Sequence, residues 1–242
     1  MNSFSTVFAQ MCKAIVFKLF GLYLSRVNPL DLEKIKIEIF TKILTNSGGD
    51  LHIGANSGDE RNFYQDHNLK VIWIEADPDI YQILLTNISD CKNQIAFQGL
   101  LLDTPGEKYE FFRFNNDGYS NSIFKLGTLS GYEKSGLEII GSVLLQSLTL
   151  DEMFSDSFLE DYPHWVIDIQ GSEMLMLAGS TRNLQYCHSI KIEVSTREVY
   201  KGGATFDGIN EFLQNHGFYC LFSPPKEFHG DILFLKHKSL NF

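Results

Sequence analysis

Apolar and polar positions follow two alternating periods along the chain, a helical period near 3.6 residues and a strand period near two. Residues 30–46 (LDLEKIKIEIFTKILTN) have the spacing of an amphipathic helix, which the Ser-Gly-Gly run at 47–49 ends. Short β-branched and aromatic runs then alternate with segments of helical composition. In the first half, the predicted strands are 50–53, 71–75 and 95–99, and the predicted helices are 59–67 and 80–88, the latter starting near Pro78.

The second half resumes the alternation after an irregular stretch. Residues 107–114 (EKYEFFRF) predict an additional strand, and Asn115–Gly141, rich in Asn, Gly and Ser, predicts a long functional loop or lid. The later strands are expected at 164–169, 189–194, 218–222 and 231–236, with helices at 173–179 and 206–216, the second closed by Gly217.

This order of elements predicts an α/β fold, with a mostly parallel twisted sheet and helices on both faces. The connection between the last two strands is too short for a helical crossover, so the C-terminal strand should be antiparallel. Such an arrangement resembles the fold of Rossmann-like methyltransferases.

The N-terminal region 1–46 is expected to be a helical extension packed on a single domain that spans residues 47–242. The apolar stretch Phe4–Leu24 is interrupted by Lys13 and Lys18, which argues against a transmembrane segment. Its apolar positions have helical spacing. We favour a helix packed on the domain or on a protein partner over peripheral membrane contact.

Composition narrows the classes of partner. A formal charge of −10 argues against a general nucleic-acid binder, because phosphate contacts need clustered Lys and Arg. The four cysteines form no CxxC pair, so free thiols in a reducing, cytoplasmic compartment are expected. The sequence indicates no oligomeric state.

A glycine-containing turn and an acid at the end of the next strand form the first candidate site. The turn runs from His52 to Gly58 (HIGANSG), where backbone N–H groups at a helix start can approach a ligand. Asn56 replaces the middle glycine of the GxGxxG dinucleotide pattern. Glu75 follows Gly54 by about 20 residues, the spacing of an acid that binds ribose hydroxyls. The alternative is a solvated acid at a strand end.

Two further acids interrupt apolar strands. Asp168 lies in WVIDIQGSE and Glu193 in KIEVS, and both should lie at the same edge of the sheet. Paired carboxylates there could orient a substrate hydroxyl, act as a base or hold a divalent cation. Structural acids at strand ends are the alternative. Glu173, in the first turn of the next helix, could equally be a dipole-capping residue.

The segments, taken in order, resemble the FkbM-type family of S-adenosylmethionine (SAM)-dependent methyltransferases over roughly residues 51–236. LHIGANSGDE and VIWIEADPDIYQILLTNI resemble its first two motifs, and HWVIDIQGSEMLMLAGS is the most similar segment. FQGLLLD, NNDGYSNSIF and IKIEVSTREVYKGG resemble its middle and later regions.

The resemblance implies a class I methyltransferase fold with SAM as the methyl donor. The residues that it implies for the cofactor are His52, Gly54, Ala55, Asn56, Gly58, Glu75, Asp168 and, less strongly, Asp103. Acceptor contacts are expected at Asn121, Ser122, Gln170, Glu173, Arg197 and Tyr200.

One position departs from the pattern. His52 stands where many class I methyltransferases have an acid that helps to hold the methionine amino group, and neutral histidine supplies no negative charge. Asp168 or Glu173 could compensate.

The predicted activity is methylation of a hydroxyl on a sugar, glycan or other small molecule. Asp168 is the first candidate base and Glu193 the second, acting directly or through a metal ion. No HxxxH or HxH pair supports a histidine metal site. The alternatives are a nucleotide-dependent oxidoreductase and a non-catalytic module that retains the fold.

Overall fold

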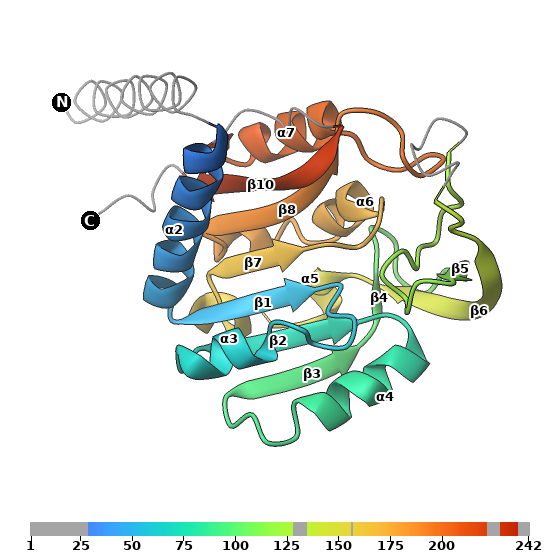
Figure 1. Cartoon of the computed structure of the whole chain (residues 1–242), viewed down its shortest axis with the longest axis horizontal. Coiled ribbons are helices and arrows are strands. Elements are labelled where there is room, and N and C mark those ends of the chain that lie inside the picture. The colour runs from blue at the N-terminus through green and yellow to red at the C-terminus, as the bar shows by residue number, and fades with distance from the viewer. Residues whose placement is uncertain (1–28, 128–134, 156, 222–227, 237–242) are drawn as a thin grey trace.

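The computed structural model describes residues 29–127, 135–155, 157–221 and 228–236, so the expected helix within Phe4–Leu24 lies outside the described residues. A seven-stranded sheet forms the centre, in the order β3-β2-β1-β7-β8-β10-β9 (Figure 1). β10 runs antiparallel to both of its neighbours, and the other pairs are parallel. The predicted α/β fold with a C-terminal antiparallel strand is confirmed.

The predicted elements of this sheet and its covering helices occur close to their expected positions. The strands of this sheet are β1 Gly49–Ile53, β2 Lys70–Glu75, β3 Gln94–Gln98, β7 His164–Ile167, β8 Ser189–Ser195, β9 Phe218–Cys220 and β10 His229–Lys236. The helices are α2 Pro29–Ser47, α3 Arg61–Asp66, α4 Pro78–Asn87, α5 Leu150–Met153, α6 Glu173–Ala178 and α7 Phe206–Asn215. Short 3-10 turns lie at Phe158–Asp161 and Asn183–Gln185.

Side chains that alternate along β1 build a core on each face of the sheet. Leu51 and Ile53 point into a core that also contains residues of α5, α6 and α7. The opposite face, around Trp73, is covered by α2, α3 and α4. Helices therefore cover both faces, as the sequence predicts.

The helix α2 lies across several strands of the sheet (Figure 1). Its Leu44 is buried against the core around Trp73, and Phe40 packs edge-on against the His164 ring of β7. Near the other edge of the sheet, Ile39 and Ile43 pack against side chains of β9 and β10. None of the helices in the described ranges combines the length and apolar content that a bilayer crossing requires.

A second, three-stranded sheet lies beside the carboxyl ends of β1, β2 and β7 (Figure 1). It consists of β4 Leu100–Leu101, β5 Lys108–Phe114 and β6 Ile139–Leu148. The strand β5 was predicted, but β6 was not, and the loop expected at Asn115–Gly141 ends earlier, where β6 begins. The exposed face of β6 carries Ile140 and Leu144, so apolar residues occupy both faces and obscure the alternation that identifies a strand.

Candidate active site

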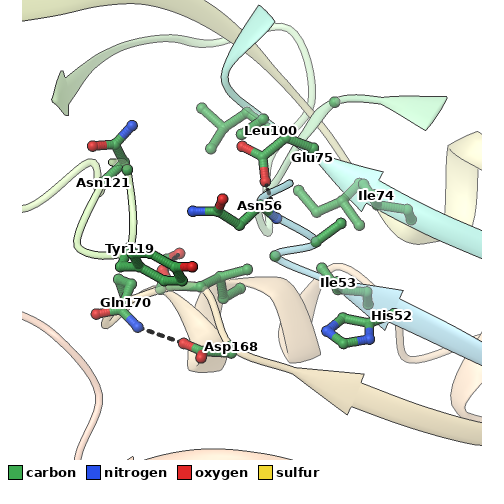
Figure 2. A pocket seen from close by; sticks show the side chains of 18 of the residues that line it. His52, Ile53, Asn56, Ile74, Glu75, Leu100, Tyr119, Asn121, Asp168 and Gln170 are labelled. Atoms are coloured by element: carbon green, nitrogen blue, oxygen red, sulfur yellow. Dashed lines mark hydrogen bonds between the residues drawn. The ribbon is translucent and has the colours of Figure 1, made fainter. Parts of the chain in front are cut away.

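A cavity opens at the carboxyl ends of β1, β2 and β7, where doubly wound sheets bind their ligands (Figure 2). The turn after β1 and the end of β2 supply one wall. The loop after β7 and the Gly118–Asn121 segment supply the other. Sequence-predicted residues that line it are His52, Gly54, Ala55, Asn56, Glu75, Asn121, Asp168 and Gln170.

The turn after β1 is tight because two strands approach each other closely there. Gly54 has φ +85, and a Cβ at this position would lie 1.8 Å from the carbonyl oxygen of Asp168. Asn56 also has positive φ, at 45°, and its side chain lies at the cavity. Gly58 does not line the cavity, contrary to expectation; a Cβ there would meet Leu84 of α4 at 2.7 Å, so this glycine permits helix packing.

Glu75 lies at the end of β2 with both carboxylate oxygens held by backbone donors. The amide of Asn56 donates to Oε2 and the amide of Asp77 to Oε1, each at 2.8 Å. Burial raises the pKa of Glu75 to about 7, although these two hydrogen bonds favour the ionised form. Each oxygen can accept a further hydrogen bond, so the group can still bind a diol in the cavity.

An ion pair that the sequence did not reveal fixes the segment after Glu75. Asp77 caps α4 and is buried, and Arg113 of β5 donates to both of its oxygens at 2.6 Å. Asn121 donates to Asp77 as well, at 3.2 Å, and accepts from the amide of Phe114 at 2.9 Å. Since Arg113 and Asp77 lie on different elements, sequence spacing gave no signal for this contact.

His52 lies under the cavity in an aromatic environment. Its ring stacks on Trp73 at 4.7 Å between centroids, and Nδ1 is 3.0 Å from the hydroxyl of Tyr64. Burial, with a smaller contribution from the charge of Lys191, lowers the pKa of His52 to about 3. The ring is therefore neutral at physiological pH and offers no charge to an ammonium group.

A second, more polar cavity lies next to the first. It measures about 530 Å³, within the range of ~300–1,000 Å³ usual for small-molecule sites. The two cavities share three lining residues, Tyr119, Asp168 and Gln170. The second is also lined by Asn115, Asn116, Ser120, Ser135, Gly136, Leu137, Glu193 and His229.

Gln170 joins the two predicted acids. Its side-chain amide donates to Asp168 Oδ1 at 2.5 Å and to Glu193 Oε2 at 2.9 Å. Its own oxygen accepts from the hydroxyl of Tyr200 at 2.6 Å, and its backbone oxygen accepts from Ser122 at 2.7 Å. The structure thus brings Asp168, Glu193 and Gln170 together, with Tyr200 and Ser122 as supports behind them.

The two carboxyl groups differ in their charge state. Burial and the negative charge of Glu193 raise the pKa of Asp168 well above its usual value. Burial acts in the same direction on Glu193, but the hydrogen bond and attraction of His229 outweigh it and lower its pKa. Nε2 of His229 is 2.8 Å from Glu193 Oε1. These opposite shifts favour a proton on Asp168 and a charge on Glu193.

Three other predicted residues lie outside both cavities. Asp103 is exposed beyond β4, and the guanidinium of Arg197 stacks on Phe228 at 3.7 Å. Glu173 is buried and accepts from the amides of Gly171 and Ile169, at 3.0 and 3.3 Å. It lies in the first turn of α6 and holds the loop before that helix, so direct acceptor contact by Glu173 stays a prediction.

The loop after β5 is tied to the turn after β1. The hydroxyl of Tyr119 donates to Asp59 at 2.6 Å, and the Asn56 side chain donates to the Asp117 carbonyl at 3.3 Å. These contacts place Tyr119 over the boundary between the two cavities. The sequence predicted a functional loop here but gave no signal for the contacts that hold it.

The divalent cation considered from the sequence has no ligand set in the described part of the chain, where no three or more His, Cys, Asp and Glu side chains are grouped to hold a metal ion. Gln170 occupies the position between Asp168 and Glu193 instead.

Known proteins resemble this chain in sequence and in fold. The 2-O-methyltransferase NoeI of Sinorhizobium fredii is 26% identical over 192 residues, which cover 76% of this chain and 77% of that protein. Magnesium protoporphyrin IX methyltransferase of Synechocystis PCC 6803, solved with SAM, is similar with a TM-score of 0.46 and 8% identity, over 93% of this chain and 96% of that one. Fibrillarin of Aeropyrum pernix, also with SAM, has a TM-score of 0.43 and 12% identity, over 79% and 68%.

The family model of the methyltransferase FkbM domain matches residues 52–220, which include the turn after β1, Glu75, Asp168 and Glu193. This span is most of the chain and contains both cavities except for His229. The chain therefore belongs to the FkbM family of SAM-dependent methyltransferases.

Proposed function

We propose that this protein transfers the methyl group of SAM to a hydroxyl group of a sugar, glycan or other small polyhydroxylated molecule. The observation that carries the proposal is the pair of adjoining cavities with Asp168 and Gln170 in their common wall. One cavity has the features of a nucleoside site, and the other is polar and contains an ionised carboxylate.

The first cavity suits the cofactor. Glu75 would accept hydrogen bonds from the ribose hydroxyls, and the turn at Gly54–Asn56 lets the backbone approach the ligand closely. When bound, SAM supplies an electrophilic methyl group on a sulfonium. Since His52 is neutral, Asp59 is the better counter-charge for the methionine ammonium: it lines the cavity, and hydrogen bonds from Tyr119 and Ser57 lower its pKa.

Glu193 is the better base, which reverses the order expected from the sequence. A base must be ionised, and the lowered pKa of Glu193 and raised pKa of Asp168 favour the charge on Glu193. Gln170 fixes the positions of both groups. Asp168 then orients the acceptor hydroxyl, and alignment of the hydroxyl oxygen with the methyl carbon supplies much of the acceleration.

The second cavity favours a neutral acceptor. Among the described residues, its lining includes two asparagines, two serines, a glutamine and the half-exposed Tyr119, but no Lys or Arg. Such side chains can pair with several hydroxyl groups, whereas an anionic group would meet the charge of Glu193. The name of the NoeI relative, a 2-O-methyltransferase, agrees with transfer to oxygen.

Transfer of labelled methyl from SAM to a panel of methyl glycosides and simple polyols tests the proposal. We expect transfer by the wild-type protein, and a loss of at least about 100-fold in Glu193→Gln, because the general base is removed. Glu211→Gln, a change of the same kind on the exposed face of α7, is the matched control and should leave the rate unchanged.

Three outcomes would contradict the proposal. Methylation of a nitrogen or carbon acceptor would change the substrate class. Full activity in Glu193→Gln would contradict the assignment of Glu193 as the base. SAM binding without transfer to any acceptor, hydroxylated or not, would favour the non-catalytic module.

A further inference from the structure

His229 is a residue that sequence reasoning did not single out and that lies beyond the span matched by the family model. It begins β10, lines the second cavity and is paired across the sheet with Ser195 of β8. Its Nε2 contacts Glu193 Oε1 at 2.8 Å, and its Nδ1 contacts the Ser195 hydroxyl at 2.7 Å. The imidazole is therefore held at both nitrogens, with the proposed base at one end.

The Ser195 hydroxyl lets this histidine keep both contacts in either protonation state. When the imidazole is charged, Nδ1–H donates to the serine oxygen and Nε2–H donates to Glu193. When it is neutral, the hydroxyl rotates and donates to Nδ1, while Nε2–H still donates to Glu193. A proton can thus be gained or lost at His229 without a rearrangement of the site.

Serine, histidine and acid also make up a nucleophilic triad, but the geometry here does not fit one. Ser195 is only 7% exposed, and the cavity that it lines, of about 10 Å³, is too small to admit a substrate carbonyl. His229 instead positions Glu193, and Ser195 positions His229.

The ionisable groups around His229 come from three strands and one helix. Glu193 of β8 is the direct partner, and Asp168 lies behind Glu193, just after β7. Glu173 of α6 and Asp231 of β10 add weaker negative potential, although Asp231 is itself paired with Lys191 at 2.7 Å. Arg197 is stacked on Phe228, the residue before His229. Among the described residues, the groups that act on His229 are thus predominantly acidic and favour an imidazolium.

We infer that His229 is a positioning residue for methyl transfer, which keeps Glu193 ionised and oriented to receive the proton of the acceptor hydroxyl. The inference rests on the proposed function. The acceptor oxygen forms its bond to the methyl carbon as the carbon–sulfur bond breaks, and the electron pair of that bond remains on sulfur. The hydroxyl proton passes to Glu193, which Gln170 and His229 hold from either side.

This role predicts a pH signature. The hydrogen bond to Glu193 raises the pKa of His229, against the effect of its partial burial. Without the imidazolium, only the hydrogen bonds from Asp168 and Gln170 would oppose the effect of burial on Glu193, so the pKa of Glu193 would rise and its proton would be held to higher pH. His229→Gln should retain a hydrogen bond to Glu193 but supply no charge.

The test compares the pH dependence of kcat in the wild type, His229→Gln and the control His67→Gln, with an acceptor found in the glycoside panel. We expect the acid limb of His229→Gln to move up by about one pH unit or more. Its deficit should be largest on the acid limb, about tenfold for each pH unit of that displacement, and should shrink as the pH rises and Glu193 ionises without His229. His67 is exposed at the end of α3, and its variant should follow the wild type.

A deficit of equal size at every pH would overturn the inference and leave His229 a structural residue.

NMR titration of the histidine rings in the complex with S-adenosylhomocysteine is a second test that does not depend on turnover. We expect the His229 pKa to lie above its ordinary value of about 6.5 in the wild type and to fall in Glu193→Gln. If no acceptor is methylated, the proposed function fails. If the pKa of His229 lies at its ordinary value and does not change in Glu193→Gln, the inference itself is contradicted.

Discussion

At the scale of single residues, backbone conformation and charge decide which side chain can occupy each position of the site. The sequence identified Gly54 as part of a ligand-binding turn, and the structure gives the reason: the carbonyl of Asp168 occupies the space of a side chain. Gly48 offers a comparison, since its φ of +89 is similar and nothing lies within 4 Å of the position that a Cβ would take.

Substitution of these two glycines by alanine separates the cost of a positive φ from the cost of a steric clash with the added Cβ. Gly48→Ala should cost about 1 kcal/mol of unfolding free energy, the strain of a left-handed residue. Gly54→Ala should cost several kcal/mol more, since the backbone at 54 or 168 must move. Urea denaturation measures both values. Equal losses would show that the contact with Asp168 is not tight.

His52 predicts how stability depends on pH. The pKa of His52 in the folded state is about 3, whereas in the unfolded chain the ring takes up a proton below about pH 6.5. The stability is complete above that pH and is lost as the pH falls from about 6.5 towards 3. His164, with a pKa lowered to about 3 by burial, adds to this loss.

The unfolding free energy of His52→Gln should therefore rise relative to that of the wild type, by about 1.4 kcal/mol for each pH unit below about 6.5. Unfolding free energies measured between about pH 7.5 and 4.5 give the comparison, with the exposed His67→Gln as control. Glu75 and Glu173, whose raised pKa values act in the opposite sense, are common to both proteins and cancel in the difference. Parallel curves would contradict a neutral, buried His52.

At the scale of elements, the strands and helices of the main sheet followed from sequence patterns because each buries a regular set of positions. The strand β6 escaped because apolar residues on its exposed face hide its period. The contacts between elements could not be predicted for another reason. Nothing in the sequence distinguishes Arg113 and Asp77 from other charged residues, and only folding places β5 beside the start of α4.

The ion pair between Arg113 and Asp77 should be strongly coupled. Arg113→Gln leaves the buried Asp77 carboxylate without its cation, which should cost about 3 kcal/mol of unfolding free energy. Asp77→Asn combined with Arg113→Gln should cost less than the sum of the two single changes. A double-mutant cycle by urea denaturation measures this coupling. Additive losses would mean that the pair contributes little.

At the scale of the whole molecule, the order of strands brings separate sequence motifs to one edge of the sheet. The turn after β1, Glu75 and Asp168 were predicted to meet there, and they line one cavity. The second cavity could not be predicted in the same way, because it depends on the loop between β5 and β6 and on His229 of β10. Asp103 and Arg197 lie outside both cavities, because a motif fixes a position in sequence but not the direction of a side chain.

The central claim is that the cavity at the ends of β1, β2 and β7 binds SAM, and isothermal titration of SAM and S-adenosylhomocysteine tests it most directly. We expect both ligands to bind the wild type, and Glu75→Gln to weaken binding by at least about tenfold, or 1.4 kcal/mol, with Glu211→Gln unchanged. A wild-type protein that binds neither ligand at millimolar concentration, or a Glu75→Gln variant of undiminished affinity, would contradict the account.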